Sequence, residues 1–281
     1  MSWIDALPAN RRRGSFPRCL LSTHGEQPQV AARLESLVGL PDVTVTAEDV
    51  WMPQGIPRRL PDATWNCRAT EEAKLGEASA FLDSTQREAV TTWWLAAVGR
   101  ANTPNWDIAS TCSVSGQRGL LLVEAKAHNE ELNKESIGKT VPMKQSRNGE
   151  ANHERIGDAI GLACAGLEAA TSLRWFISRD THYQMSNRFA WAWKVASLGL
   201  PVVLVYLGFL RAEEMRGGVR RPFADHAEWR SLVETHSAPL FPRGCGNGGG
   251  RYTGSPSSRS SDRGNSLWWS QTERSVYERT S

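Results

Sequence analysis

The pattern that most restricts how this chain can fold is a pair of apolar stretches joined by Ser115-Gly116. Ser-Gly is a turn signal, and a two-residue loop there pairs Val114 with Gln117. Counting outward along antiparallel strands then places Asp107 directly opposite Glu124, with Cβ atoms about 4.5–5.5 Å apart. A longer loop would shift the pairing by a residue or more. The sequence therefore predicts a β-hairpin in which two carboxylates face each other.

The opposite face of the predicted hairpin, which spans residues 105–127, supports the same register. Its cross-strand pairs would be Trp106 with Ala125, Ile108 with Val123, Ser110 with Leu121 and Cys112 with Gly119. This face is mostly apolar, and a slip of one residue would turn it away from the core. We expect its burial to hold the register.

The two facing carboxylates point to a metal site. Strand alternation puts Glu124 and Lys126 on one face, with the side chain between them on the other. Like charges at this distance repel unless a cation lies between them. The same Glu-Ala-Lys occurs at Glu72-Ala73-Lys74, but residues 70–82 have an apolar spacing typical of a helix, and there we expect an exposed helical turn.

These residues resemble the motif of the PD-(D/E)xK nuclease superfamily, the restriction-endonuclease-like phosphodiesterases. Pro104-Asn105-Trp106-Asp107 matches the first half of the motif and Glu124-Ala125-Lys126 the second. The resemblance covers roughly residues 71–210. It implies Mg²⁺, for which Mn²⁺ can substitute, held by Asp107 and Glu124, with Lys126 positioning or deprotonating the attacking water.

The chemistry of these side chains agrees with that implication. Hydrolysis of a phosphodiester needs a nucleophilic water and relief of the charge that builds on the phosphate, and a hard cation on carboxylate oxygens provides both. A lysine beside the cation either has its pKa lowered or stabilises the developing charge as an ammonium. The sequence leaves both roles open for Lys126.

The order of the predicted elements is close to the αβββαβ order of the superfamily. After the helical stretch at 70–82, the expected elements are a helix at 83–98 with a capping box at Asp83, the hairpin, a polar loop at 128–152, helices at 153–172 and 182–198, and a buried strand at 201–210. The superfamily has a further strand before the Asp strand, which either residues 43–46 supply from upstream or the sheet edge lacks. We expect an α/β fold with a restriction-endonuclease-like core, a mixed central β-sheet flanked by helices.

Composition divides the chain into three parts. Residues 1–70 are rich in Pro and Arg and form an N-terminal extension with a short helix at 30–38, residues 71–242 form the nuclease-like core, and residues 243–281 are rich in Gly, Ser and Arg. The last part lacks apolar periodicity, so we expect it to be disordered.

Further site candidates are weaker. A first-helix glutamate near the metal, common in the superfamily, would be Glu77 or Glu88, although either fits an exposed helix charge as well. Gln184 and Arg188 are four residues apart and share a helix face, from which they could meet phosphate or the metal-bound water. Hydrogen bonding at the start of the helix explains them equally well. His128 is expected to be a surface histidine.

Charge and composition limit the classes of partner that we expect for this protein. The net charge of +3 lies in the tail after Pro242, so a phosphate-binding groove must be local, for example near Arg188, Lys194 and lysines 134, 139 and 144. The scattered cysteines, five in all, and the lack of a long apolar run predict a cytoplasmic protein with no membrane partner. The expected partner is nucleic acid, DNA rather than RNA, with a homodimer or partner subunit supplying recognition. The alternative is a catalytically silent nucleic-acid-binding or scaffold module of the same fold.

Overall fold

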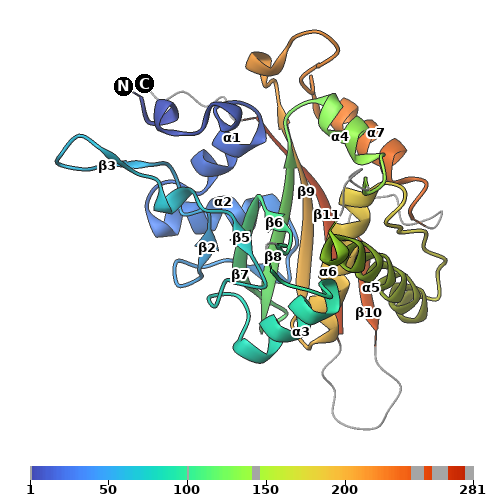
Figure 1. The fold of residues 1–281 in the computed structure, drawn as a ribbon. Helices are drawn as coiled ribbons and strands as arrows, with labels where there is room; N and C mark the ends of the chain where they lie inside the picture. The colour runs from blue at the N-terminus through green and yellow to red at the C-terminus, as the bar shows by residue number, and fades with distance from the viewer. Residues whose placement is uncertain (1, 100, 141–145, 242–249, 255–264, 276–281) are drawn as a thin grey trace.

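A mixed β-sheet with helices on both faces forms the centre of the protein (Figure 1). The computed structural model describes residues 2–99, 101–140, 146–241, 250–254 and 265–275. The sheet strands are β1 (Val43–Thr44), β2 (Trp51–Met52), β7 (Ile108–Val114), β8 (Gln117–Lys126), β9 (Val202–Leu210), β10 (Gly250–Gly254) and β11 (Asn265–Ser275). They follow in the order β1-β7-β8-β9-β11-β10, with β2 also paired to β7. The predicted α/β class is confirmed.

The β7–β8 hairpin has the predicted turn and register. Ser115 and Gly116 have φ values of 49° and 79°, as a two-residue hairpin loop with a left-handed backbone requires. The strands pair antiparallel from Val114 opposite Gln117 to Ile108 opposite Val123. β8 then pairs parallel with β9, which is buried throughout and matches the strand predicted at 201–210.

The segment before β7 leaves the hairpin, and the predicted position of Trp106 is wrong. The chain bends at Asp107, and β6 (Asn105–Trp106) pairs with β5 (Ala73–Lys74) instead of continuing along β8. Trp106 packs in the hydrophobic core that contains Trp94 and Trp191, whereas Ile108 packs in the core on the opposite face of the sheet. The bend therefore reverses the face expected for this indole.

The helix predicted at 70–82 is also wrong. The structure has the short strand β5 there, followed by turns, and long-range contacts explain the difference. Glu72 accepts hydrogen bonds from Arg11 at 3.1 Å and from Asn105 at 3.0 Å, while Ala73 and Leu75 are buried on alternate positions. These contacts hold the segment extended, so tertiary packing overrides its helical spacing.

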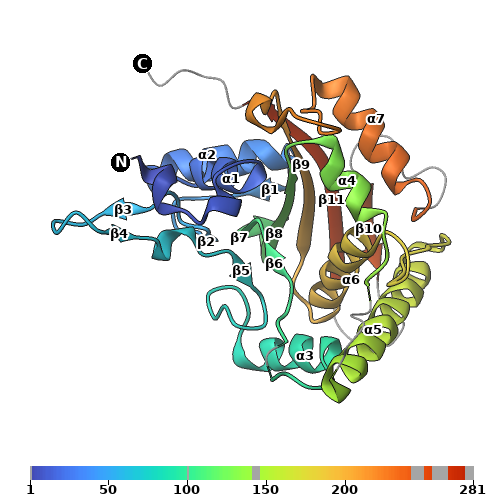
Figure 2. The same cartoon turned by 45° about the horizontal axis from the view of Figure 1, so that its top comes forward.

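One face of the sheet is covered by α3 (Ser84–Trp94), α4 (Asn129–Glu135), α5 (Arg147–Thr171), α6 (Tyr183–Ser197) and α7 (His226–Ser237) (Figures 1 and 2). The capping box at the start of α3 is confirmed, with Gln86 N donating to Asp83 Oδ1 at 2.8 Å. The polar loop expected at 128–152 is wrong in part, because it contains α4 and residues 147–152 of α5, while residues 141–145 lie outside the described residues. Ala127 N and His128 N both donate to Glu131, which fixes the start of α4.

The other face is covered by α1 (Ser15–Ser22) and α2 (Gln27–Val38), as Figure 2 shows. Leu34 and Val38 of α2 pack in one core with Val123 of β8 and Val205 of β9. The extra strand expected beside the Asp strand is β1, which pairs antiparallel with β7. The N-terminal segment therefore supplies both strands and a helical layer to the sheet.

A small ribbon lies outside this sheet. It consists of β3 (Arg58–Arg59) and β4 (Trp65–Asn66), and the 3-10 helices η1 (Trp3–Ala6), η2 (Ala9–Arg11), η3 (Arg68–Thr70) and η4 (Glu213–Met215) complete the fold. The sequence predicts disorder from residue 243 onward. The structure instead pairs β11 with β9 and with β10. Residues 243–249, 255–264 and 276–281, which belong to the same prediction, lie outside the described residues.

Candidate functional site

The hairpin brings Asp107 beside Glu124. The ladder ends at the pair Ile108–Val123, and Asp107 lies at the bend just before it, close enough to Glu124 for the charge of Glu124 to raise its pKa. Its Oδ2 accepts a hydrogen bond from the backbone N–H of Ala125 at 2.7 Å. This bond fixes a half-buried carboxylate next to the end of β8.

Glu124 is the centre of a buried charge cluster. Its side chain is 2% exposed, and three donors reach it. Lys126 Nζ and Gln184 Nε2 both contact Oε1, and Arg188 Nε donates to Oε2 at 2.6 Å. Gln184 and Arg188 are one turn apart on α6, so the helix face predicted from their spacing does point at the site.

Arg188 connects this cluster to the aromatic core. Its guanidinium carbon lies 4.6 Å from the ring centroid of Trp106 and is buried with Glu124. Burial alone raises the pKa of Glu124, but the charges of Arg188 and Lys126, together with their hydrogen bonds, outweigh it and lower that pKa. Glu124 is therefore an ionised carboxylate held in position by two cations.

Asp107 is in the opposite electrostatic situation. Burial and the neighbouring charge of Glu124 raise its pKa to about 8, against the smaller effects of Lys126 and of the hydrogen bond from Ala125. At neutral pH, with no cation between the carboxylates, Asp107 keeps a proton. The repulsion expected from the sequence is thus expressed as a raised pKa.

Lys126 lies between two carboxylates. Its Nζ contacts Glu124 and lies 2.5 Å from Oε1 of Glu135, a residue of α4 with a fully buried side chain. Burial lowers the pKa of Lys126, but Glu124, Glu135 and Asp107 together raise it above the ordinary value. The amine is therefore a charged ammonium, which favours charge stabilisation over proton abstraction.

Glu135 and its neighbours are the site residues that sequence reasoning missed. His236 Nε2, on α7, lies 3.3 Å from Glu135 Oε2, and the rings of His236 and His182 are 4.9 Å apart. Tyr206, opposite Glu124 on β9, is buried in the same cluster. The sequence carries no local signal for these contacts, because they join elements far apart in the chain.

Other predicted residues lie elsewhere. Glu77 is 62% exposed and pairs with Lys74 at 3.5 Å, so it does not join the cluster. Glu88 lies on α3, where its carbonyl accepts a hydrogen bond from Thr92. His128, expected at the surface, is buried beside Glu131.

The predicted phosphate-groove cations are also dispersed. Lys139 Nζ lies 4.8 Å from the ring centroid of Tyr183, and Lys194 Nζ lies 5.8 Å from that of Trp93. Lys134 is exposed on α4, and Lys144 lies outside the described residues.

The donor set fits a hard divalent cation with few protein ligands. Asp107 Oδ1 makes no hydrogen bond or ion pair within the described part of the chain. Glu124 would have to give up part of its contact with Lys126, Gln184 or Arg188 to bind the cation. Across the described ranges, no group of three or more Asp, Glu, His or Cys side chains is arranged to hold a metal. Mg²⁺ commonly takes one or two carboxylates and fills its other positions with water and substrate phosphate. Two carboxylates beside an ammonium meet that requirement.

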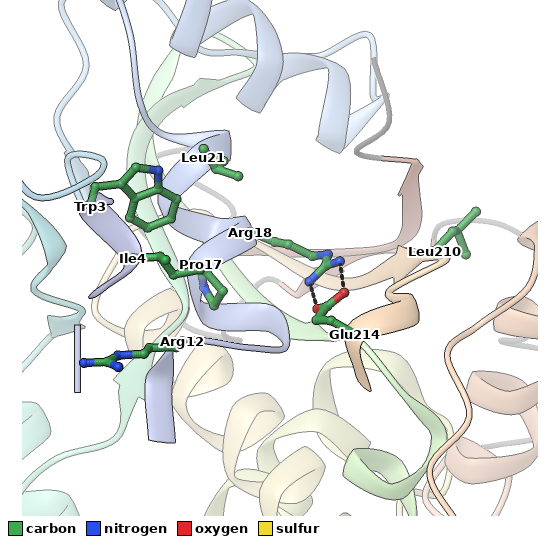
Figure 3. A pocket seen from close by; sticks show the side chains of 8 residues that line it. All are labelled: Trp3, Ile4, Arg12, Pro17, Arg18, Leu21, Leu210 and Glu214. Carbon is green, nitrogen blue, oxygen red and sulfur yellow. Dashed lines mark hydrogen bonds and ion pairs between the residues drawn. The ribbon is translucent and has the colours of Figure 1, made fainter. Parts of the chain in front are cut away.

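A separate pocket of about 270 Å³ lies between the N-terminal helices and the end of β9 (Figure 3). Arg18 and Glu214 form a two-pronged ion pair beside it, with Arg18 Nη2 donating to Oε2 at 2.8 Å. Arg12 and apolar side chains, among them Trp3 and Leu21, line the rest. None of the predicted catalytic residues lines this pocket, so it is distinct from the cluster.

Comparison of the chain with protein-family models, with curated proteins and with solved structures finds no match. No helix within the described residues is both long and apolar enough to cross a bilayer.

Proposed function

We propose that the protein is a metal-dependent phosphodiesterase of the PD-(D/E)xK type, a nuclease that hydrolyses nucleic acid, with DNA preferred to RNA. The observation that carries this proposal is the convergence of Asp107, Glu124 and Lys126 at the end of one hairpin, where Asp107 accepts a hydrogen bond from Ala125 N and Lys126 contacts Glu124. The raised pKa of Asp107 adds support, because perturbed carboxylates cluster at functional sites.

The order of elements supports a restriction-endonuclease-like core for this enzyme. α3 precedes the β7–β8 hairpin, α5 and α6 follow it, and β9 returns parallel to β8. β1 stands beside β7 where the αβββαβ order has its additional strand. The site lies where the hairpin meets α6.

In the proposed hydrolysis, a bound cation and the side chains of the site have separate roles. When bound, Mg²⁺ supplies a water of lowered pKa and a positive charge against the phosphate. Asp107 and Glu124 are the residues that would hold it, and Arg188 keeps Glu124 oriented through the bond to Oε2. The Lys126 ammonium, kept charged by Glu124 and Glu135, lies beside them and stabilises negative charge on the phosphate.

One observation favours the second candidate, a nucleic-acid-binding or scaffold module without activity. Both oxygens of Glu124 are engaged by Lys126, Gln184 and Arg188, an arrangement that satisfies the buried carboxylate without a metal. In such a module the cluster would be a structural ion network. The two candidates differ in whether Mg²⁺ competes with these donors.

The test is incubation of the purified protein with plasmid, linear and single-stranded DNA and with RNA, with and without Mg²⁺ or Mn²⁺. We expect metal-dependent cleavage of DNA, and a loss of about 100-fold or more in the variant Lys126→Met. Lys74→Met is the matched control, because Lys74 ends the other Glu-Ala-Lys of the chain and lies outside the cluster. DNA binding without cleavage under all conditions would favour the module, and equal activity of the Lys126 variant would remove that residue from the mechanism.

A further inference from the structure

The β3–β4 ribbon projects from the body of the protein beside the N-terminal helices (Figures 1 and 2). Among the strands that the structure describes, it pairs only within itself, with Arg58 opposite Asn66 and Arg59 opposite Trp65. Its loop is closed by a hydrogen bond from Leu60 N to the carbonyl oxygen of Thr64 at 2.9 Å. The ribbon is thus an ordered arm rather than part of either core.

The arm carries unpaired positive charge on both of its faces. Arg58 and Arg59 are exposed, and neither side chain has a hydrogen bond or ion pair to any described residue. Because neighbouring strand residues point to opposite faces, one arginine projects from each side of the ribbon. The single acid between the strands, Asp62, is engaged by Thr64, whose hydroxyl donates to it at 2.6 Å. With two arginines against this one carboxylate, residues 58–66 are net positive.

This arrangement fits a grooved polyanion better than a flat one. The major groove of B-form DNA is about 12 Å wide and admits a two-stranded ribbon between two phosphate backbones. Arginines on opposite faces of the ribbon would each meet one of those backbones. A flat acidic protein surface would engage only one of the two faces. The major groove of double-stranded RNA is too narrow for side chains to enter in this way.

The base of the arm is fastened to the segment that carries Asp107. β4 leads through η3 into β5, which pairs with β6 directly before Asp107. Glu72, beside β5, also accepts a hydrogen bond from Asn105 of β6 at 3.0 Å. A duplex held by the arm is thus held by a segment continuous with the catalytic hairpin.

We infer that the β3–β4 ribbon is a DNA-binding arm that inserts into the major groove of a duplex and holds it for the Asp107–Glu124–Lys126 site. The inference rests on the proposed nuclease function and adds to it the surface that binds the substrate and the form of that substrate. Arg58 and Arg59 are its phosphate-contacting residues.

The test uses fluorescence anisotropy to measure how the full-length protein binds a labelled DNA duplex. The buffer contains a chelator, so that no strand is cut. For Arg58→Glu/Arg59→Glu we expect Kd to rise about 10- to 100-fold, and the slope of log K against log salt to shrink by about two, roughly one for each lost phosphate contact. Arg155→Glu/Arg230→Glu is the matched control, since it makes the same charge change on exposed arginines of α5 and α7. Unchanged thermal unfolding would show that both pairs of substitutions leave the fold intact.

The outcomes separate the inference from the proposed function. Unchanged affinity and salt slope in the arm variant, with DNA cleavage retained in Mg²⁺, would overturn the arm and leave the nuclease standing. An equal loss of affinity in the control variant would also overturn it, because the effect would then be one of net charge. Equal affinity of the wild-type protein for double-stranded RNA would overturn groove insertion. Absence of both DNA binding and cleavage in the wild-type protein would overturn the arm and the nuclease together.

Discussion

Replacing Asp107 by asparagine in metal-free buffer should stabilise the protein at alkaline pH. The folded structure raises the pKa of Asp107 from 3.8 to about 8. A carboxyl group with a raised folded-state pKa contributes its full stability below the unfolded-state pKa, and that stability is lost as pH rises towards the folded-state value. An asparagine at this position would carry no charge, and its side-chain oxygen can keep the hydrogen bond from Ala125 N.

The size of the effect follows from the same pKa change. At about 1.4 kcal/mol for each tenfold change in proton affinity, the upper limit is about 6 kcal/mol above pH 8. Asp107 is only half-buried, so solvent screening reduces this figure, and we expect Asp107→Asn to gain about 2–3 kcal/mol over the wild-type protein. The gain should shrink progressively as the pH is lowered from 8.5 towards 5.

The assay is urea unfolding followed by tryptophan fluorescence in EDTA across this pH range. Asp158→Asn, the same exchange at an exposed position of α5, is the control and should show no such pH-dependent gain. Adding Mg²⁺ should stabilise the wild-type protein at pH 8 and have little effect on the Asp107 variant. A gain that is constant with pH, or a variant less stable than the wild type at pH 8.5, would refute the electrostatic reasoning.

The remaining predictions concern the buried partners of the cluster. Glu124→Gln leaves Lys126 and Arg188 without their shared carboxylate, so urea unfolding should show a loss of about 3–5 kcal/mol. Glu135→Gln removes one of the two carboxylates at Lys126 and should lower the free energy of unfolding by about 1–3 kcal/mol. Glu130→Gln on the same helix is the control and should leave the stability nearly unchanged. Equal effects of the two substitutions would contradict a role for Glu135 in holding Lys126.

The parts of the fold that the sequence predicts well depend on local signals. A two-residue turn and strict alternation determine the β7–β8 register, and the Asp83 side chain determines the start of α3. The strand β9 is recognisable because every residue of it is apolar or small and it is bounded by Pro201. Gln184 is predictable as a site residue because helical spacing alone puts it on the face of Arg188.

The features that the sequence predicts wrongly or misses all depend on long-range contacts. Glu72 is held by Arg11, 61 positions away, and by Asn105, 33 positions away, so its helical spacing is overridden. Glu135 reaches the site only because α4 packs beside β8 and α7 brings His236 to it. Nothing in the residues adjacent to Glu135 distinguishes it from an exposed acid on a polar segment.

The helical layer formed by α1 and α2 limits how far the protein can be shortened. A fragment that begins at residue 71 would keep every member of the charge cluster. It would also expose one apolar face of the sheet to solvent, because Val123 and Val205 pack against these helices. An exposed apolar face of this kind favours self-association over a stable monomer. A search for a minimal active fragment should therefore retain the chain from Ser15 onward.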